Sequence, residues 1–141
     1  MYVEMSGGGS STPTETSLWT NPTPTTSMPN NYAATLSEDY TNFDCIKIRY
    51  RYSTSRAYYF SATIGVGDME YSSTSASTTN PKSVPFFGLQ FGATVTKIYY
   101  RRIFHQETEN NKTLRFSANY GTSTTADNDY TIPVELIGIK Y

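Results

Sequence analysis

Hydrophobic and polar residues alternate along most of this chain, and a period of two is typical of β-strands. The clearest case is the segment 43–52 (FDCIKIRYRY), where apolar and aromatic residues occupy the even positions from 46 onward and basic residues the odd ones. Segments of strand length lie at residues 17–20, 32–36, 43–52, 57–66, 86–93, 94–106, 114–120 and 130–141. Since no segment has the period of an amphipathic helix, the pattern predicts an all-β chain: an antiparallel, jelly-roll-like β-sandwich of about eight strands.

The final predicted strand, residues 130–141 (YTIPVELIGIKY), is apolar and ends the chain. Its apolar positions change parity at Leu136–Ile137, which predicts a β-bulge near Gly138. Residues 114–120 alternate cleanly before a polar loop. We therefore expect residues 114–141 to form the last hairpin of the sandwich, with the terminal strand inside a sheet and near a subunit interface.

The beginning of the chain differs in composition from the rest. Residues 1–16 (MYVEMSGGGSSTPTET) are rich in Gly, Ser and Thr and cannot bury a core. This segment is predicted to be a flexible N-terminal tether or docking segment, and residues 17–141 to be the β-sandwich domain. It also lacks the basic and apolar regions of a secretory signal, so we expect no Sec-type export.

Charge and hydropathy narrow the range of partners. The chain has 141 residues, a net charge of -1 and only 16% charged residues. Nucleic-acid binding through phosphates needs clustered Lys and Arg, so no nucleic-acid partner is expected. No apolar run reaches the roughly 18 residues of a membrane span, so no membrane insertion is expected. The 13 tyrosines suit both β-strands and sugar-binding or interface surfaces.

Catalytic and metal-binding patterns are weak. Cys45 is the single cysteine and His105 the single histidine, and nothing in the sequence places them together. The run 127–129 (DND) lacks the ligand spacing of a calcium loop. We therefore predict no catalytic residues, no metal site and no cofactor, and a chain that is not an enzyme.

Three stretches carry a family resemblance. They are residues 18–24 (LWTNPTP) with the following 32–36 (YAATL), residues 43–48 (FDCIKI), and the ending 132–141 (IPVELIGIKY), which is similar to the pattern IP-x-x-IYGIK. Together they resemble the C-terminal receptor-binding or fibre-type modules of tail-fibre and head-fibre proteins in phages of Gram-positive or gut bacteria. The resemblance implies a β-sandwich that trimerises and contacts the host envelope, usually its glycans or teichoic acids.

On this basis we expect a phage virion structural protein that mediates attachment to the host cell surface by glycan binding. It would be located in the virion, made in the host cytoplasm and released by lysis. The expected partners are a second and third copy of itself in a homotrimer, a host cell-surface glycan, and other virion proteins bound through residues 1–16. Two alternatives stay open: a capsid head-fibre or decoration protein with a mainly structural role, and a free carbohydrate-binding module.

Aromatic residues in loops and at strand ends are the candidate ligand-binding residues, because an aromatic ring can stack on a sugar. They are Trp19, Tyr71, Tyr99, Tyr120 and Tyr130. Trp19 is an equally good candidate for a core or subunit-interface anchor.

Overall fold

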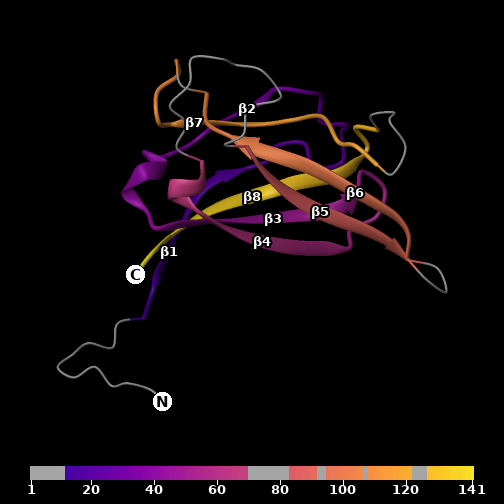
Figure 1. Ribbon diagram of the computed structural model, residues 1–141, viewed down its shortest axis with the longest axis horizontal. Helices are drawn as coiled ribbons and strands as arrows, with labels where there is room; N and C mark the ends of the chain where they lie inside the picture. Colours follow the sequence, from indigo (N-terminus) through magenta and orange to yellow (C-terminus); the bar gives the residue numbers. More distant parts are fainter. Residues whose placement is uncertain (1–11, 70–82, 92–94, 107, 122–126) are drawn as a thin grey trace.

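The computed structural model describes residues 12–69, 83–91, 95–106, 108–121 and 127–141. These residues form a β-sandwich of two four-stranded antiparallel sheets (Figure 1), which confirms the predicted fold class and strand number. The elements are β1 (Thr14–Thr20), β2 (Tyr32–Thr35), η1 (Tyr40–Asn42), β3 (Cys45–Ser53), β4 (Tyr59–Gly65), η2 (Val66–Asp68), β5 (Val84–Phe91), β6 (Val95–Phe104), β7 (Thr113–Phe116) and β8 (Tyr130–Lys140), where η denotes a 3₁₀ turn.

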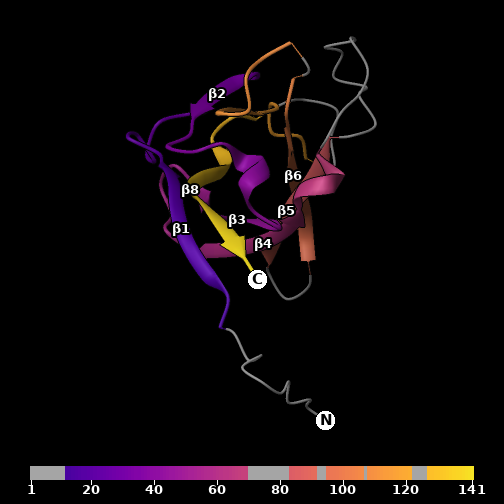
Figure 2. The same cartoon turned by 90° about the vertical axis from the view of Figure 1, so that its left-hand side faces the viewer.

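Strands from the two ends of the chain pair with one another. Sheet A has the order β1-β8-β3-β4 and sheet B the order β2-β7-β6-β5. The pairs β1–β8 and β2–β7 nest as in a jelly roll, whereas the inner strands form the local hairpins β3–β4 and β5–β6. β1 begins at Thr14, opposite Lys140, so Thr14–Thr16 of the predicted tether are part of a sheet. The start of β1 and the C-terminus therefore lie at the same end of the sandwich (Figure 2).

The core lies between the two sheets and follows the alternation of the sequence. In β3, Ile46, Ile48 and Tyr50 face inward and are at most 3% exposed. Leu114 and Phe116 of β7 are fully buried on the opposite side. The remaining fully or nearly fully buried apolar side chains include Met28, Ala34, Tyr40, Met69, Phe86, Ile103, Ile132 and Leu136. Burial of a large apolar side chain stabilises the fold by about 1.5–3 kcal/mol, so this layer supplies most of the driving force.

The prediction of a last hairpin at residues 114–141 was wrong. β7 belongs to sheet B and β8 to sheet A, so the segment between them crosses from one sheet to the other. The terminal strand does lie inside its sheet, since β8 is flanked by β1 and β3. Its apolar residues are thus covered within the subunit, and burial alone no longer calls for a neighbouring copy.

The bulge predicted near Gly138 was assigned to the wrong strand: the register between β1 and β8 does shift opposite Leu136 and Ile137, but the extra residue there is Leu18 of β1. The register between β3 and β8 shifts where Arg49 pairs with Glu135 and Tyr50 pairs with Pro133, which leaves Val134 as the extra residue. Gly138 continues a regular ladder opposite Ile46. A glycine is required there because the Phe43 ring covers it: a Cβ at residue 138 would lie 2.6 Å from Phe43 Cγ.

Candidate functional site

Three aromatic rings lie side by side on the outer face of sheet B. Phe87 of β5 pairs directly with Tyr100 of β6, and Tyr100 forms an isolated antiparallel bridge with Tyr120. The ring centroids of Phe87 and Tyr100 are 6.1 Å apart, and those of Tyr100 and Tyr120 are 5.7 Å apart. We call Phe87, Tyr100 and Tyr120 the aromatic row.

The rings of the row are accessible while their backbones are fixed. Phe87 is 50% exposed, and Tyr100 and Tyr120 are half-buried. The backbones of Tyr100 and Tyr120 exchange two hydrogen bonds of 2.8 and 2.9 Å. The Tyr50 hydroxyl donates from the core side to the carbonyl oxygen of Phe87. A surface built on paired strands in this way holds its rings in place before any ligand arrives.

The described side chains around the row carry little charge. Ile98 and Arg102 flank Tyr100 on the same face of β6, each two residues away. Ile98 is 42% exposed. Arg102 Nη1 donates to both the carbonyl and the hydroxyl oxygen of Ser83, each at 3.1 Å. The described outer positions of β5, Pro85 and Phe87, are apolar. As far as the described side chains show, the row is an apolar strip with polar tyrosine hydroxyls, bordered by the Arg102 guanidinium.

A second aromatic group, the tyrosine cluster of Tyr52, Tyr58, Tyr99 and Tyr130, lies at the end of the sandwich away from the C-terminus. The rings of Tyr99 and Tyr130 are stacked, with centroids 4.3 Å apart and planes 4° apart. Tyr52 contacts the other three rings at 5.3 to 6.3 Å. Burial, the neighbouring tyrosines and a hydrogen bond with Tyr130 raise the pKa of Tyr99 to about 12. Tyr99 is only 4% exposed, so its ring contributes to packing between the sheets.

The predicted ligand-binding residues are thus distributed over separate places. Tyr99 and Tyr130 come together in the tyrosine cluster, and Tyr120 belongs to the aromatic row. Trp19 is half-buried against Tyr32 and Phe116, with centroids at 5.9 and 5.7 Å, and so packs on the core. Tyr71 lies outside the described residues.

Sequence reasoning missed Phe87 and Tyr100, although a signal was present. Each belongs to a pair of consecutive aromatic residues, Phe86–Phe87 and Tyr99–Tyr100. Because neighbouring residues in a strand point to opposite faces, one ring of every such pair must point outward. In the pair Tyr58–Tyr59, at the start of β4, both rings are exposed, at 63% and 53%, and Tyr59 lies on the outer face of sheet A, 5.4 Å from the Arg49 guanidinium.

One buried side chain holds the segments around both aromatic groups. Arg101 is 0% exposed and makes six hydrogen bonds with five backbone carbonyls. The carbonyls belong to Met28, Ser117, Asn128, Tyr130 and Thr131. Burial lowers the pKa of Arg101 to about 9, so the guanidinium stays charged at neutral pH. Arg101 therefore holds in place the two ends of the segment that connects β7 of sheet B to β8 of sheet A.

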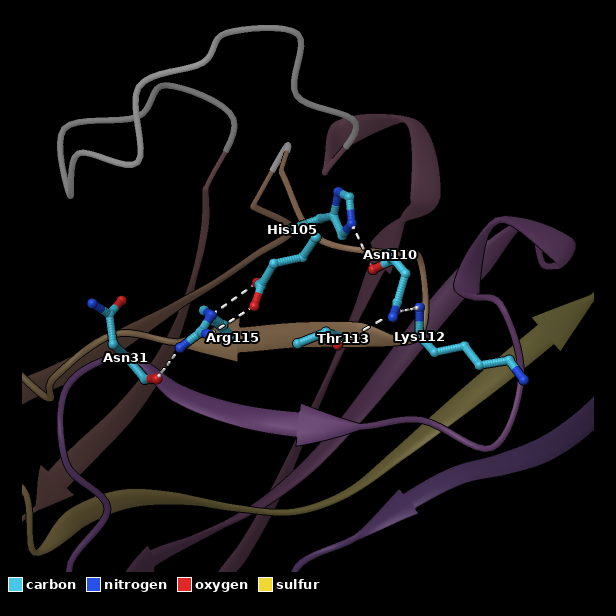
Figure 3. A network of polar contacts seen from close by, with 7 residues as sticks. Asn31, His105, Asn110, Lys112, Thr113 and Arg115 are labelled. Carbon is cyan, nitrogen blue, oxygen red and sulfur yellow. Dashed lines mark hydrogen bonds and ion pairs between the residues drawn. The ribbon is translucent and has the colours of Figure 1, made fainter.

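His105 has a structural place in the turn between β6 and β7 (Figure 3). Its Nε2 lies 3.0 Å from the carbonyl oxygen of Asn110, and its ring contacts Tyr40. Arg115 donates to both carboxylate oxygens of Glu109 at 2.8 and 2.7 Å and to the carbonyl of Asn31. The hydrogen bond from Arg115 lowers the pKa of the Glu109 carboxyl. These contacts join the hairpin turn to the segment before β2.

Two absences among the described residues and two comparisons with known proteins complete the description. Among the described residues, no group of three or more His, Cys, Asp and Glu side chains could hold a metal ion. In the same part of the chain, no helix has the length and apolar character needed to cross a membrane. A scan against protein-family models and a search of curated proteins found no match to this chain.

Proposed function

We propose that this chain is a non-enzymatic structural protein of a phage virion, a fibre-type module that attaches to a host cell-surface glycan. The observation that carries the glycan-binding part is the aromatic row of Phe87, Tyr100 and Tyr120 on an exposed sheet face. The virion part rests on the resemblance of residues 18–24, 43–48 and 132–141 to fibre-type modules.

The chemistry of the row suits sugars. A pyranose ring has an apolar face of C–H groups and a rim of hydroxyls, and an aromatic ring stacks on the C–H face. Tyrosine adds a hydroxyl that can exchange hydrogen bonds with the rim. Phe87 is half exposed in the free protein, so a ligand that covers it gains the free energy of removing an apolar ring from water.

The arrangement of the chain supports attachment through the N-terminal segment. The N-terminal segment enters β1 at Thr14, beside Lys140. The tyrosine cluster lies at the opposite end of the sandwich, and Tyr100 of the aromatic row is the residue after Tyr99 of that cluster. In our proposal, residues 1–16 contact other virion proteins and three copies associate around a common axis, as the resemblance implies. Several weak glycan sites on one particle would then give firm attachment.

Cell binding by variants of the purified protein tests the glycan-binding part. Phe87→Ala and Tyr100→Ala should each reduce adhesion to envelopes from a panel of Gram-positive and gut bacteria. Tyr59→Ala is the matched control, because Tyr59 is about as exposed as Phe87 but lies on the outer face of sheet A. Adhesion that survives both row substitutions, in protein with an unchanged circular dichroism spectrum, would refute a role for the row.

A deletion separates attachment from capsid decoration. Removal of residues 1–11 leaves β1 whole, whereas removal of 1–16 would take away Thr14–Thr16, which pair with β8. We expect virions to lose the shortened protein while the purified domain still binds cells. Normal incorporation would place the anchor elsewhere, and a lack of cell binding by both forms would favour the decoration role. Light scattering of the purified chain tests the trimer directly, and a monomer would contradict it.

A further inference from the structure

We infer that the aromatic row binds one extended chain of a neutral, β-linked polysaccharide, with one sugar unit on each of its three rings. The inference rests on the proposed function and adds the class of glycan, its direction on the sheet and the number of units in contact. It follows from three properties of Phe87, Tyr100 and Tyr120: their spacing, the angles between their ring planes and the charge around them.

The spacing indicates a chain that runs across the strands. Phe87, Tyr100 and Tyr120 lie directly opposite one another on three neighbouring segments, so the row is perpendicular to β5 and β6. Steps of 6.1 and 5.7 Å between centroids are comparable to the advance of one sugar unit along an extended polysaccharide. Chains with equatorial β-linkages are extended in this way, whereas α-1,4-linked chains coil away from a straight row.

The ring planes favour a single chain over a flat crystalline surface. The planes of Phe87 and Tyr100 differ by 44°, and those of Tyr100 and Tyr120 by 34°. A flat array of sugars cannot lie against three rings that turn by this much. A free chain can rotate about each glycosidic bond and place one C–H face on each ring in turn. The row therefore selects soluble or surface-tethered single chains.

The charge around the row favours a neutral chain. The ionised group closest along β6 on the same face is Arg102, and its Nη1 is already held by Ser83. A polyanion such as a teichoic acid would need several free cations to compensate its repeating phosphates. Stacking on Phe87, Tyr100 and Tyr120 needs none, and it does not weaken with salt.

Titration calorimetry with defined oligosaccharides tests the inference. The probes are soluble β-1,4-linked oligomers of glucose, mannose and N-acetylglucosamine, from the monosaccharide to the hexasaccharide, with α-1,4-linked glucose oligomers and crystalline cellulose and chitin as controls. Affinity should rise steeply to the trisaccharide and then level off in one β-linked series. It should exceed the affinity for the crystalline powders and be unchanged by added salt.

Substitutions assign the subsites. Each of Phe87→Ala, Tyr100→Ala and Tyr120→Ala should lower the affinity for the trisaccharide about fivefold to tenfold, because each removes one accessible ring from the contact. Tyr59→Ala should leave it unchanged. Equal affinity for a monosaccharide, preference for α-linked oligomers, or no binding in any β-linked series would overturn the inference.

The outcomes distinguish this inference from the proposed function. If row variants lose cell adhesion but no β-linked oligomer binds, the row takes a different ligand and the attachment role stands. Adhesion abolished by salt would point to an anionic polymer and overturn the neutral-chain inference alone. Self-association that is lost in Tyr100→Ala would make the row a subunit contact and also overturn it. If row variants adhere as well as the wild type, the proposed role of the row in attachment fails.

Discussion

Substitution of Gly138 by alanine tests how β8 fits into the sandwich. The Phe43 ring lies over this glycine, and an added Cβ would sit 2.6 Å from Cγ, 2.7 Å from Cδ1 and 2.8 Å from Cδ2. Real Cβ contacts essentially never fall below 3.0 Å, so one of the two residues must move. Cγ can leave this position only by rotation about the Cα–Cβ bond of Phe43, which would carry the whole ring out of its packed site, or by a shift of the backbone. Phe43 follows η1, is 8% exposed and belongs to the core, so that movement is resisted.

The expected cost of Gly138→Ala follows from two opposing terms. Alanine restricts the unfolded chain more than glycine does, which by itself would stabilise the protein by about 0.4–1 kcal/mol. Overpacking of a closely packed site costs more, typically about 1–3 kcal/mol. We therefore expect a net loss of about 1–2 kcal/mol in the free energy of unfolding, measured by urea denaturation with an unchanged m-value.

Two comparisons decide whether the Phe43 contact is the cause. Gly67→Ala is the matched control, because a Cβ there would meet nothing within 4 Å. The second comparison uses a Phe43→Ala background, with an osmolyte to offset the stability lost with the core ring. There, Gly138→Ala should not lower the free energy of unfolding. The double-mutant cycle should therefore give a coupling energy of at least about 1 kcal/mol. The reasoning fails if Gly138→Ala and Gly67→Ala behave alike, or if the cost at residue 138 is the same with and without the ring.

Three further predictions concern the interior near the crossing between the sheets. Arg101→Met should abolish folding or cost more than about 5 kcal/mol in urea denaturation, because each buried carbonyl left without a donor costs about 1–3 kcal/mol; the half-buried Arg102→Met should cost far less. Thr131→Gly should stabilise the protein by about 1 kcal/mol, since Thr131 has a φ of 53° and a buried hydroxyl with no partner among the described residues; a lower urea midpoint would contradict this. The pKa of Tyr99 is raised from 10.0 to about 12, so Tyr99 stays protonated to a higher pH in the folded state than in the unfolded state. The free energy of unfolding should therefore fall as pH rises from 10 to 12. Tyr99→Phe should show a shallower decline over that range.

The strands could be predicted from the sequence, but their assignment to sheets could not. Alternation places Ile46, Ile48 and Tyr50 on one face of a strand wherever that strand lies. It does not say which strands share a sheet, and so residues 114–141 were predicted to form a hairpin although they cross between sheets. The signal for the crossing is Arg101, which stands at an inward position between Tyr99 and Ile103. Only the structure shows that five carbonyls compensate its charge.

The sequence pattern placed the bulge of β8 at the wrong residue because this strand is buried on both faces. Leu136 faces the core opposite Ile48, while Ile137 and Ile139 lie on the other face and are still only 9% and 7% exposed. Apolar residues on both faces look like a change of parity when only the sequence is read. The real extra residue, Val134, lies beside Pro133, which has no N–H for the ladder.

The aromatic row depends on the same register that fills the core. In the observed pairing of β5 with β6, Phe86 and Arg101 point inward while Phe87 and Tyr100 point outward. A slip of one residue would exchange these faces and carry the Arg101 guanidinium away from its five carbonyls. Such a slip would leave buried carbonyls unpaired, at a cost that approaches the stability of a whole domain of about 5–15 kcal/mol. The buried arginine therefore fixes which ring of each aromatic pair is exposed, and with it the spacing of the rings that we propose bind the glycan.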